Sequence, residues 1–188
     1  MPDLPRIELT SESALWTWMA TNHASGSLLL VTWKAAVRDK YLSRDQVLDA
    51  LVAFGWIDGR RWTHEDPART IQLIGPRKTI VWAATYKRRA ARLIEEGRMA
   101  GPGLAAYQAA QRSGRWDDSN HVDALVVPGD LRKALQSAGA LSWFDASAPS
   151  YRRNVLRFLA QSKRLETRRK RIDLIAAHAE RGERVPQY

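Results

Sequence analysis

The stretch FGWIDGRRW, residues 54–62, constrains the fold most strongly, because it joins a helix-ending signal to a strand signal. Upstream, Ser43 and Gln46 have the spacing of a capping box, which predicts that a helix begins there. Gly55 is the natural C-terminal stop of that helix, since glycine adopts a left-handed conformation at little cost. The sequence therefore predicts a helix that ends at Gly55 and a sheet that resumes directly after it.

An Asp-Gly pair at 58–59 predicts a tight turn inside this stretch. Arg60 and Arg61 follow, so the Asp58 carboxylate can hold one of the two guanidiniums in a paired geometry. The alternative is that Asp58 only shapes the turn while the neighbouring tryptophans belong to the core.

Three segments of the first hundred residues have strand character. A continuous apolar run at 28–33 predicts a buried strand, and residues 60–65 and 69–75 predict two more strands joined by an Asp-Pro turn. A helix capped by Thr10 or Ser11 precedes them. These segments predict a small antiparallel sheet of about three strands, accompanied by helices.

Beyond Pro76 the pattern becomes helical, with a first helix expected from Trp82 to Gly97. Short strands followed by consecutive helices predict an α+β fold whose C-terminal half is all-helical. We expect an α+β N-terminal domain over residues 1–100 and a helical region over 101–188 packed on it. The tail that starts at Glu183 is expected to be loose.

Composition narrows the function classes. The net charge is +10 and the isoelectric point is about 10.4, which favours anionic partners such as nucleic acid or phosphorylated metabolites. The absence of cysteine excludes thiol catalysis and cysteine-based zinc sites, and the four histidines lack metal spacing, so no metal and no cofactor is predicted. Without a long apolar run or a leader pattern, we expect no membrane span and a cytoplasmic location. The sequence does not determine the oligomeric state.

Several motifs along the chain occur together in one known family. The most specific are FGWIDG at 54–59 and SKRLETR at 162–168, and others are PRK at 76–78, LIEEGRM at 93–99, GRW at 114–116 and PGDL at 128–131. Along almost its whole length, the chain resembles the YdeI/OmpD-associated family of bacterial proteins, also described as bacteriocin-protection proteins. The resemblance implies a cytoplasmic protein linked to the stress response or to envelope protection. It implies no enzyme activity, cofactor or catalytic set.

The segment GPRKT, residues 75–79, is the strongest candidate binding site, because it lies between an apolar strand and a helix start. The free N–H groups of a helix N-terminus attract anions, and Arg77, Lys78 and the capping hydroxyl of Thr79 would add to that attraction. The segment matches no nucleotide-binding loop, and the alternative is a solvated basic turn. We expect an anionic small molecule to bind residues from this segment and from 54–62: Asp58, Arg60, Arg61, Arg77, Lys78 and Trp82.

The C-terminal forty residues contain a second basic cluster, which could contact the phosphates of a nucleic acid. The alternative is that these cations lie on solvated helix faces, with Glu166 pairing to Lys170. The candidate nucleic-acid-binding residues are Arg152, Arg153, Arg157, Lys163, Arg164, Arg168, Arg169, Lys170 and Arg171.

A third possibility is an enzyme in which His23 and Asp58 act as acid and base. No nucleophile accompanies them in a recognisable motif, and His23 can equally cap the first helix. The sequence therefore favours a non-enzymatic binder of an anionic ligand over a nucleic-acid-associated protein, and both over an enzyme.

Overall fold

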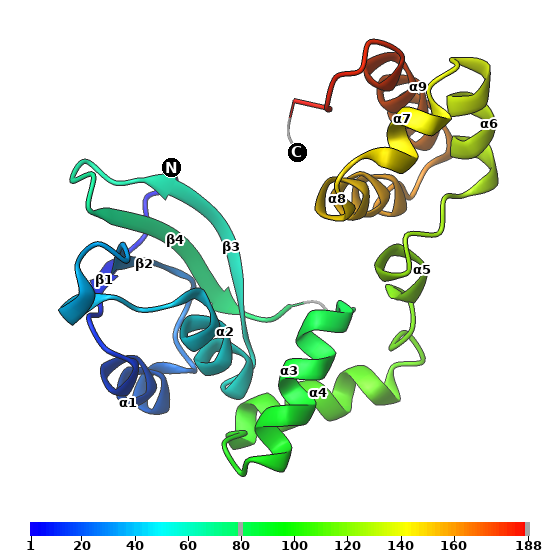
Figure 1. Cartoon of the computed structure of the whole chain (residues 1–188). Coiled ribbons are helices and arrows are strands. Elements are labelled where there is room, and N and C mark those ends of the chain that lie inside the picture. Colours follow the sequence, from blue (N-terminus) through cyan, green and yellow to red (C-terminus); the bar gives the residue numbers. More distant parts are fainter. Residues whose placement is uncertain (79–80, 187–188) are drawn as a thin grey trace. The chain divides into compact units, whose positions relative to one another are not determined.

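The structure is a computed structural model that describes residues 1–78 and 81–186. The chain forms two compact units, residues 1–118 (unit 1) and residues 119–188 (unit 2), whose helices and strands are labelled in Figure 1. Each unit has its own hydrophobic core. Unit 1 combines a sheet with helices, so the fold class is α+β as expected.

Within the described part of unit 1, the sheet has four strands in the order β1-β2-β4-β3. β1 (Arg6–Glu8) is parallel to β2 (Leu28–Trp33), whereas β4 (Arg69–Pro76) is antiparallel to both β2 and β3 (Trp56–Thr63). The expectation of about three antiparallel strands is therefore wrong, because it omits β1. β1 is only three residues long and forms by pairing in parallel with β2. The helix α1 (Glu12–Asn22) connects the two strands, so no local sequence pattern reveals β1.

The helix before the central stretch forms as predicted. The side chains and backbones of Ser43 and Gln46 make the capping box of α2 (Arg44–Ala53). Gly55 follows the helix with a φ of 73°, a left-handed conformation that favours glycine. The local sequence is sufficient to predict α2, because the residues that begin and end this helix lie in it or directly beside it.

The predicted tight turn at residues 58–59 is wrong, because these residues lie inside β3. The strand starts at Trp56, directly after α2, and its register with β4 is irregular between Asp58 and Arg61. The Asp-Gly pair thus marks a bulge rather than a reversal of the chain. The reversal is between β3 and β4, around the predicted Asp-Pro pair at 66–67.

The two faces of the sheet differ in what covers them. Leu30 and Ile74 face the main core, which includes the buried side chains of α1 and α2 and the Trp56 ring. Leu29 and Ile71 belong to a smaller cluster on the opposite face. Gln72 of β4 lies on the same face as the main core and is only 4% exposed. A polar side chain buried among apolar neighbours needs hydrogen-bond partners.

Two further helices complete unit 1, α3 (Ala84–Glu95) and α4 (Gly101–Arg112). The predicted helix from Trp82 begins two residues later than expected, although Trp82 itself is fully buried. Its indole packs edge-on against Tyr107 of α4, with ring centroids 5.8 Å apart, and lies 6.1 Å from Trp116. An aromatic cluster therefore fixes the residues before α3 to α4.

The start of α4 lies very close to the end of α2. The Ala100 N–H donates to the Ala53 carbonyl at 3.1 Å. A Cβ atom added at Gly103 would lie 2.1 Å from the same carbonyl oxygen, a distance no side chain tolerates. The absence of a side chain at position 103 is therefore required for this contact.

Unit 2 is built from helices joined by short irregular segments. The expectation of an all-helical C-terminal half is too simple, since residues 113–119 and 124–128 are turns and loops. The tail is also less loose than expected, because Val185 is 1% exposed and its N–H donates to the Tyr151 hydroxyl at 3.3 Å. The helices are α5 (Asn120–Asp123), α6 (Gly129–Ser137), α7 (Leu141–Ala146), α8 (Pro149–Ala160) and α9 (Leu165–Glu180).

Candidate anion-binding sites

A chain of hydrogen bonds links two of the predicted ligand-binding residues through the buried glutamine of β4. Asp58 accepts from the Tyr86 hydroxyl of α3 and, at 3.1 Å, from the side-chain amide of Gln72. The Gln72 carbonyl oxygen accepts in turn from Arg61 at 2.9 Å. In the described residues no ion pair joins Asp58 to Arg60 or Arg61, so the aspartate is held by neutral donors.

Arg77 lies at the end of β4 between two aromatic rings. Its guanidinium carbon is 4.2 Å from the Trp82 ring centroid and 4.6 Å from that of Tyr86, both within cation–π range. Nη1 lies 3.5 Å from the Val81 carbonyl. Nε and Nη2 are buried and have no acceptor among the residues that the structure describes. These two atoms form one edge of the guanidinium, the edge that binds carboxylate or phosphate with two parallel hydrogen bonds.

Burial shifts the pKa values of this cluster. Burial lowers the pKa of Arg77, while the electrostatic interactions with Tyr86 and Asp58 oppose the shift. Arginine side chains remain protonated in proteins, so the guanidinium is a cation. Burial, followed by the hydrogen bond to Asp58, raises the pKa of Tyr86. Tyr86 is therefore a neutral phenol that donates to a carboxylate.

The other predicted ligand-binding residues lie apart from this cluster. The guanidinium of Arg60 lies 5.7 Å from the Trp62 ring, which packs on the opposite face of the sheet. Lys78 is exposed, and the predicted capping residue Thr79 lies outside the described residues. The structure thus brings together Asp58, Arg61, Arg77 and Trp82 but separates Arg60 and Lys78 from them.

Sequence reasoning did not select Gln72 or Tyr86. For Gln72 a signal exists, since it is the lone polar residue within the apolar run IQLIG of β4, residues 71–75. Tyr86 carries no comparable signal, because its role depends on where α3 docks.

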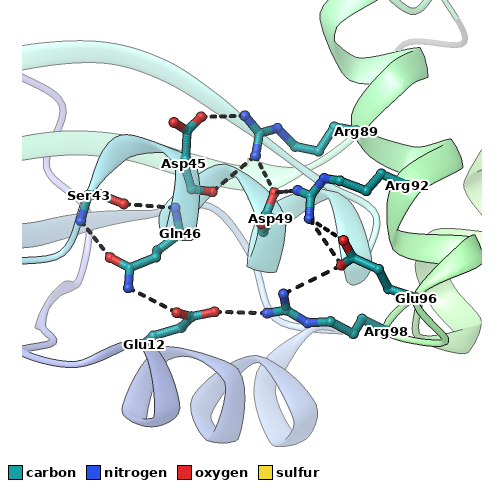
Figure 2. A network of polar contacts seen from close by, with 9 residues as sticks. All are labelled: Glu12, Ser43, Asp45, Gln46, Asp49, Arg89, Arg92, Glu96 and Arg98. Carbon is teal, nitrogen blue, oxygen red and sulfur yellow. Dashed lines mark hydrogen bonds and ion pairs between the residues drawn. The ribbon is translucent and has the colours of Figure 1, made fainter.

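A second cluster of arginines connects α3 to α2 (Figure 2). Asp49 of α2 is only 8% exposed and accepts from Arg89 and, at 2.5 Å, from Arg92. Arg89 also donates to the Asp45 carboxylate at 2.6 Å, and Arg92 donates to Glu96 at 3.0 Å. A buried carboxylate with two guanidiniums fixes the position of one helix on the other.

Two adjoining open depressions lie beside this cluster, and we call them together the α2–α3 groove. Their volumes are about 370 Å³ and 220 Å³. Arg44 and Arg88, which are exposed, have no acceptor within the described part of the chain. The larger depression is lined by Asp45, Thr85, Arg88, Arg89 and Arg92, and the smaller by Arg44, Asp45, Leu48, Thr85, Tyr86 and Arg89.

Most of the C-terminal cations have partners within unit 2. Arg168 makes two hydrogen bonds with Asp130, at 2.6 and 2.9 Å, and Arg171 donates to the Phe158 carbonyl. Ion pairs join Arg152 to Asp145, Arg157 to Asp123 and Lys170 to Glu166. Among the described residues no acceptor is present for four of the nine: Arg153, Lys163, Arg164 and Arg169.

His23 lies at the C-terminal end of α1 and contacts structural groups. Its ring stacks on Phe54 with centroids 6.1 Å apart, and Nδ1 lies 3.2 Å from the Ala20 carbonyl. Its own carbonyl accepts from the Trp56 indole at 2.7 Å. No contact joins His23 to Asp58 in the residues described, so the two groups of the enzyme hypothesis are not paired.

Comparison with known proteins assigns most of unit 1 to one family. Residues 7–106, more than half of the chain, match the family described as "Domain of unknown function (DUF8412)". The chain belongs to this family. Its DUF8412 region contains both the Arg77 cluster and the α2–α3 groove. No curated protein and no solved structure matches the chain.

The C-terminal region has a different assignment. Residues 124–182 match the family described as "Bacteriocin-protection, YdeI or OmpD-Associated", so this domain is present in unit 2. The resemblance predicted from the motifs is confirmed for that region only, and the motifs at 54–59, 76–78 and 93–99 lie within the DUF8412 region.

Proposed function

We propose that this DUF8412 member binds a small anion, a carboxylate or a phosphate, through the side-on edge of Arg77. The observation that carries the proposal is the burial of Nε and Nη2 without an acceptor in the described residues. A buried, charged donor without a partner is costly, and an anion with two oxygens satisfies both N–H groups at once.

The surroundings of Arg77 support such a role. The rings of Trp82 and Tyr86 are nearly perpendicular and the guanidinium lies against both, so contact on two sides restricts the Arg77 side chain and little conformational entropy remains to be lost on binding. Asp58 does not take up the free edge: its oxygens accept from Tyr86 and Gln72, and Nε and Nη2 of Arg77 have no acceptor in the described residues. In the proposal, Lys78 next to Arg77 adds long-range attraction.

We also propose a general cellular role for this protein. We place the protein in the cytoplasm, where anion binding by unit 1 would contribute to the stress response or bacteriocin protection named for the family found in unit 2. No described helix has both the length and the hydropathy needed to cross a membrane.

The experiment is a thermal-shift titration of the full-length chain with phosphate, sulfate and acetate. A ligand present at one hundred times its Kd stabilises the folded state by about 2.7 kcal/mol, which gives a measurable rise in Tm. Arg77→Met keeps a long side chain between the rings but removes the donors, so the shift should disappear. The matched control is Arg60→Met, which removes the same charge on the opposite face and should leave the shift unchanged.

A third variant tests the geometry rather than the charge. Arg77→Lys retains a positive charge but cannot offer two parallel donors, so the shift should fall strongly. If Arg77→Lys or Arg77→Met responds as the parent does, the proposal is wrong. Circular dichroism of each unliganded variant establishes that it is folded before the titration.

A further inference from the structure

We infer that the α2–α3 groove is a second binding site, suited to a ligand with two linked phosphoryl groups, as in a diphosphate ester. It uses different donors from the Arg77 site and does not depend on that proposal. Three features carry the inference: an open cavity, an excess of positive charge on its walls, and the distribution of that charge over two depressions.

The groove is positively charged even after its internal pairs are counted. Its four arginines meet three carboxylates: Asp45 and Asp49 both bind Arg89, and Asp49 and Glu96 both bind Arg92. The uncompensated charge therefore belongs to Arg44 and Arg88, which have no acceptor within the described residues. Arginines with unused donors beside a cavity are the usual partners of phosphate groups.

The paired arginines shape the site in advance. Asp49 is buried, and it fixes Arg89 and Arg92 of α3 against α2, so the wall between the free arginines does not depend on the ligand. A preorganised wall lowers the entropy cost of binding. The Asp45 carboxylate lies in the groove and would repel an anion, but its Oδ1 is neutralised at 2.6 Å by Arg89.

The arrangement fits two phosphoryl groups better than one. Arg88 lines only the larger depression and Arg44 only the smaller, whereas Asp45, Thr85 and Arg89 line both. Each depression thus offers one free guanidinium, and the exposed Thr85 adds a hydroxyl to both. A diphosphate can place one phosphoryl group in each depression, while a single phosphate can use only one.

The test is isothermal titration calorimetry of the full-length protein with inorganic pyrophosphate and, separately, with inorganic phosphate. Pyrophosphate should bind the parent more tightly than phosphate. Arg44→Gln or Arg88→Gln should weaken pyrophosphate binding by about tenfold or more, because each removes a charged hydrogen-bonding partner. Neither variant should weaken phosphate binding to the same extent, so the preference for pyrophosphate should fall.

The matched control is Arg112→Gln, which removes the same charge from an exposed residue of α4 outside the groove. It should change neither affinity. Equal losses in Arg112→Gln and Arg44→Gln would show a general charge effect and overturn the inference, as would undetectable pyrophosphate binding.

A further variant separates the two proposed sites. Arg77→Met should retain the pyrophosphate affinity of the groove even if it abolishes binding of small anions at Arg77. Loss of pyrophosphate binding in Arg77→Met, with Arg44→Gln unaffected, would place the diphosphate at Arg77 and overturn the inference.

Discussion

The two units use their arginines in different ways. Unit 1 has seventeen Lys or Arg against thirteen Asp or Glu, whereas unit 2 has thirteen against seven, so unit 2 is the more basic. Yet it is unit 1 that encloses a carboxylate between two guanidiniums and packs another guanidinium against two rings. In unit 2 the pair with two hydrogen bonds, Arg168 with Asp130, lies at the surface. Net charge therefore does not identify the region where cations are held in fixed geometry.

The largest expected effect tests whether the two cores are independent. Trp56 is 1% exposed and Phe144 is fully buried, each in the core of its own unit. Trp56→Ala should destabilise unit 1 by about 3–5 kcal/mol, because it removes a buried ring and leaves a cavity. Hydrogen exchange followed peptide by peptide should show lost protection in unit 1 and normal protection in unit 2.

The mirror-image variant is the control for this experiment. Phe144→Ala should lower protection in unit 2 and leave unit 1 unchanged, since the two cores share no residue. Equal losses in both units after either substitution would mean that the chain unfolds as one cooperative body.

A smaller effect is expected from the buried carboxylate of unit 1. Asp49→Asn leaves two guanidiniums without their shared anion. Removing one partner of a fully buried pair costs about 3–5 kcal/mol, but Arg92 is partly exposed and retains Glu96, so about 2–3 kcal/mol is expected. Urea unfolding of the parent and Asp49→Asn measures this loss of stability. A loss smaller than that caused by Asp130→Asn in the surface pair of unit 2 would contradict the comparison.

The smallest effect is expected from the surface pair of unit 2. The hydrogen bond from Arg168 lowers the pKa of Asp130 below its ordinary value of 3.8. A lowered pKa in the folded state stabilises the protein above pH 3.8, and this contribution is lost as the pH falls through the folded-state pKa. Asp130→Asn should therefore cost under about 1 kcal/mol near neutral pH, because the pair is solvent-exposed.

The same variant provides the pH test. Below the folded-state pKa of Asp130, parent and Asp130→Asn should have the same free energy of unfolding, and they should diverge as the pH rises above it. Urea unfolding at several acidic pH values measures this difference. A difference that grows on acidification would have the wrong sign for a lowered pKa.

Local signals predicted much of the fold. The strand at 28–33, the capping box at Ser43 and the stop at Gly55 are all confirmed, because each depends on residues close together in the sequence. The missed strand β1 depends on a partner strand twenty-three residues away. The Asp-Gly pair was assigned to a turn because turns and bulges favour the same residues.

The candidate sites were less predictable from sequence. The positive charge at a strand end points to Arg77, which is the centre of the proposed site. Its most informative property, the unpartnered edge between two rings, requires knowing where Trp82 and Tyr86 lie in space. Asp49 did carry a signal, since it is the only acidic residue within the apolar segment VLDALVA at 47–53.

The close contact at Gly103 has a consequence for how this protein tolerates change. Every other residue would place a Cβ atom against the Ala53 carbonyl, so a library covering position 103 should yield glycine alone among folded variants. At Gly101, two residues earlier, the corresponding space is empty, and alanine should be accepted. If only glycine is accepted at position 103, the reason is the close packing of α4 on α2, whatever ligand the protein binds.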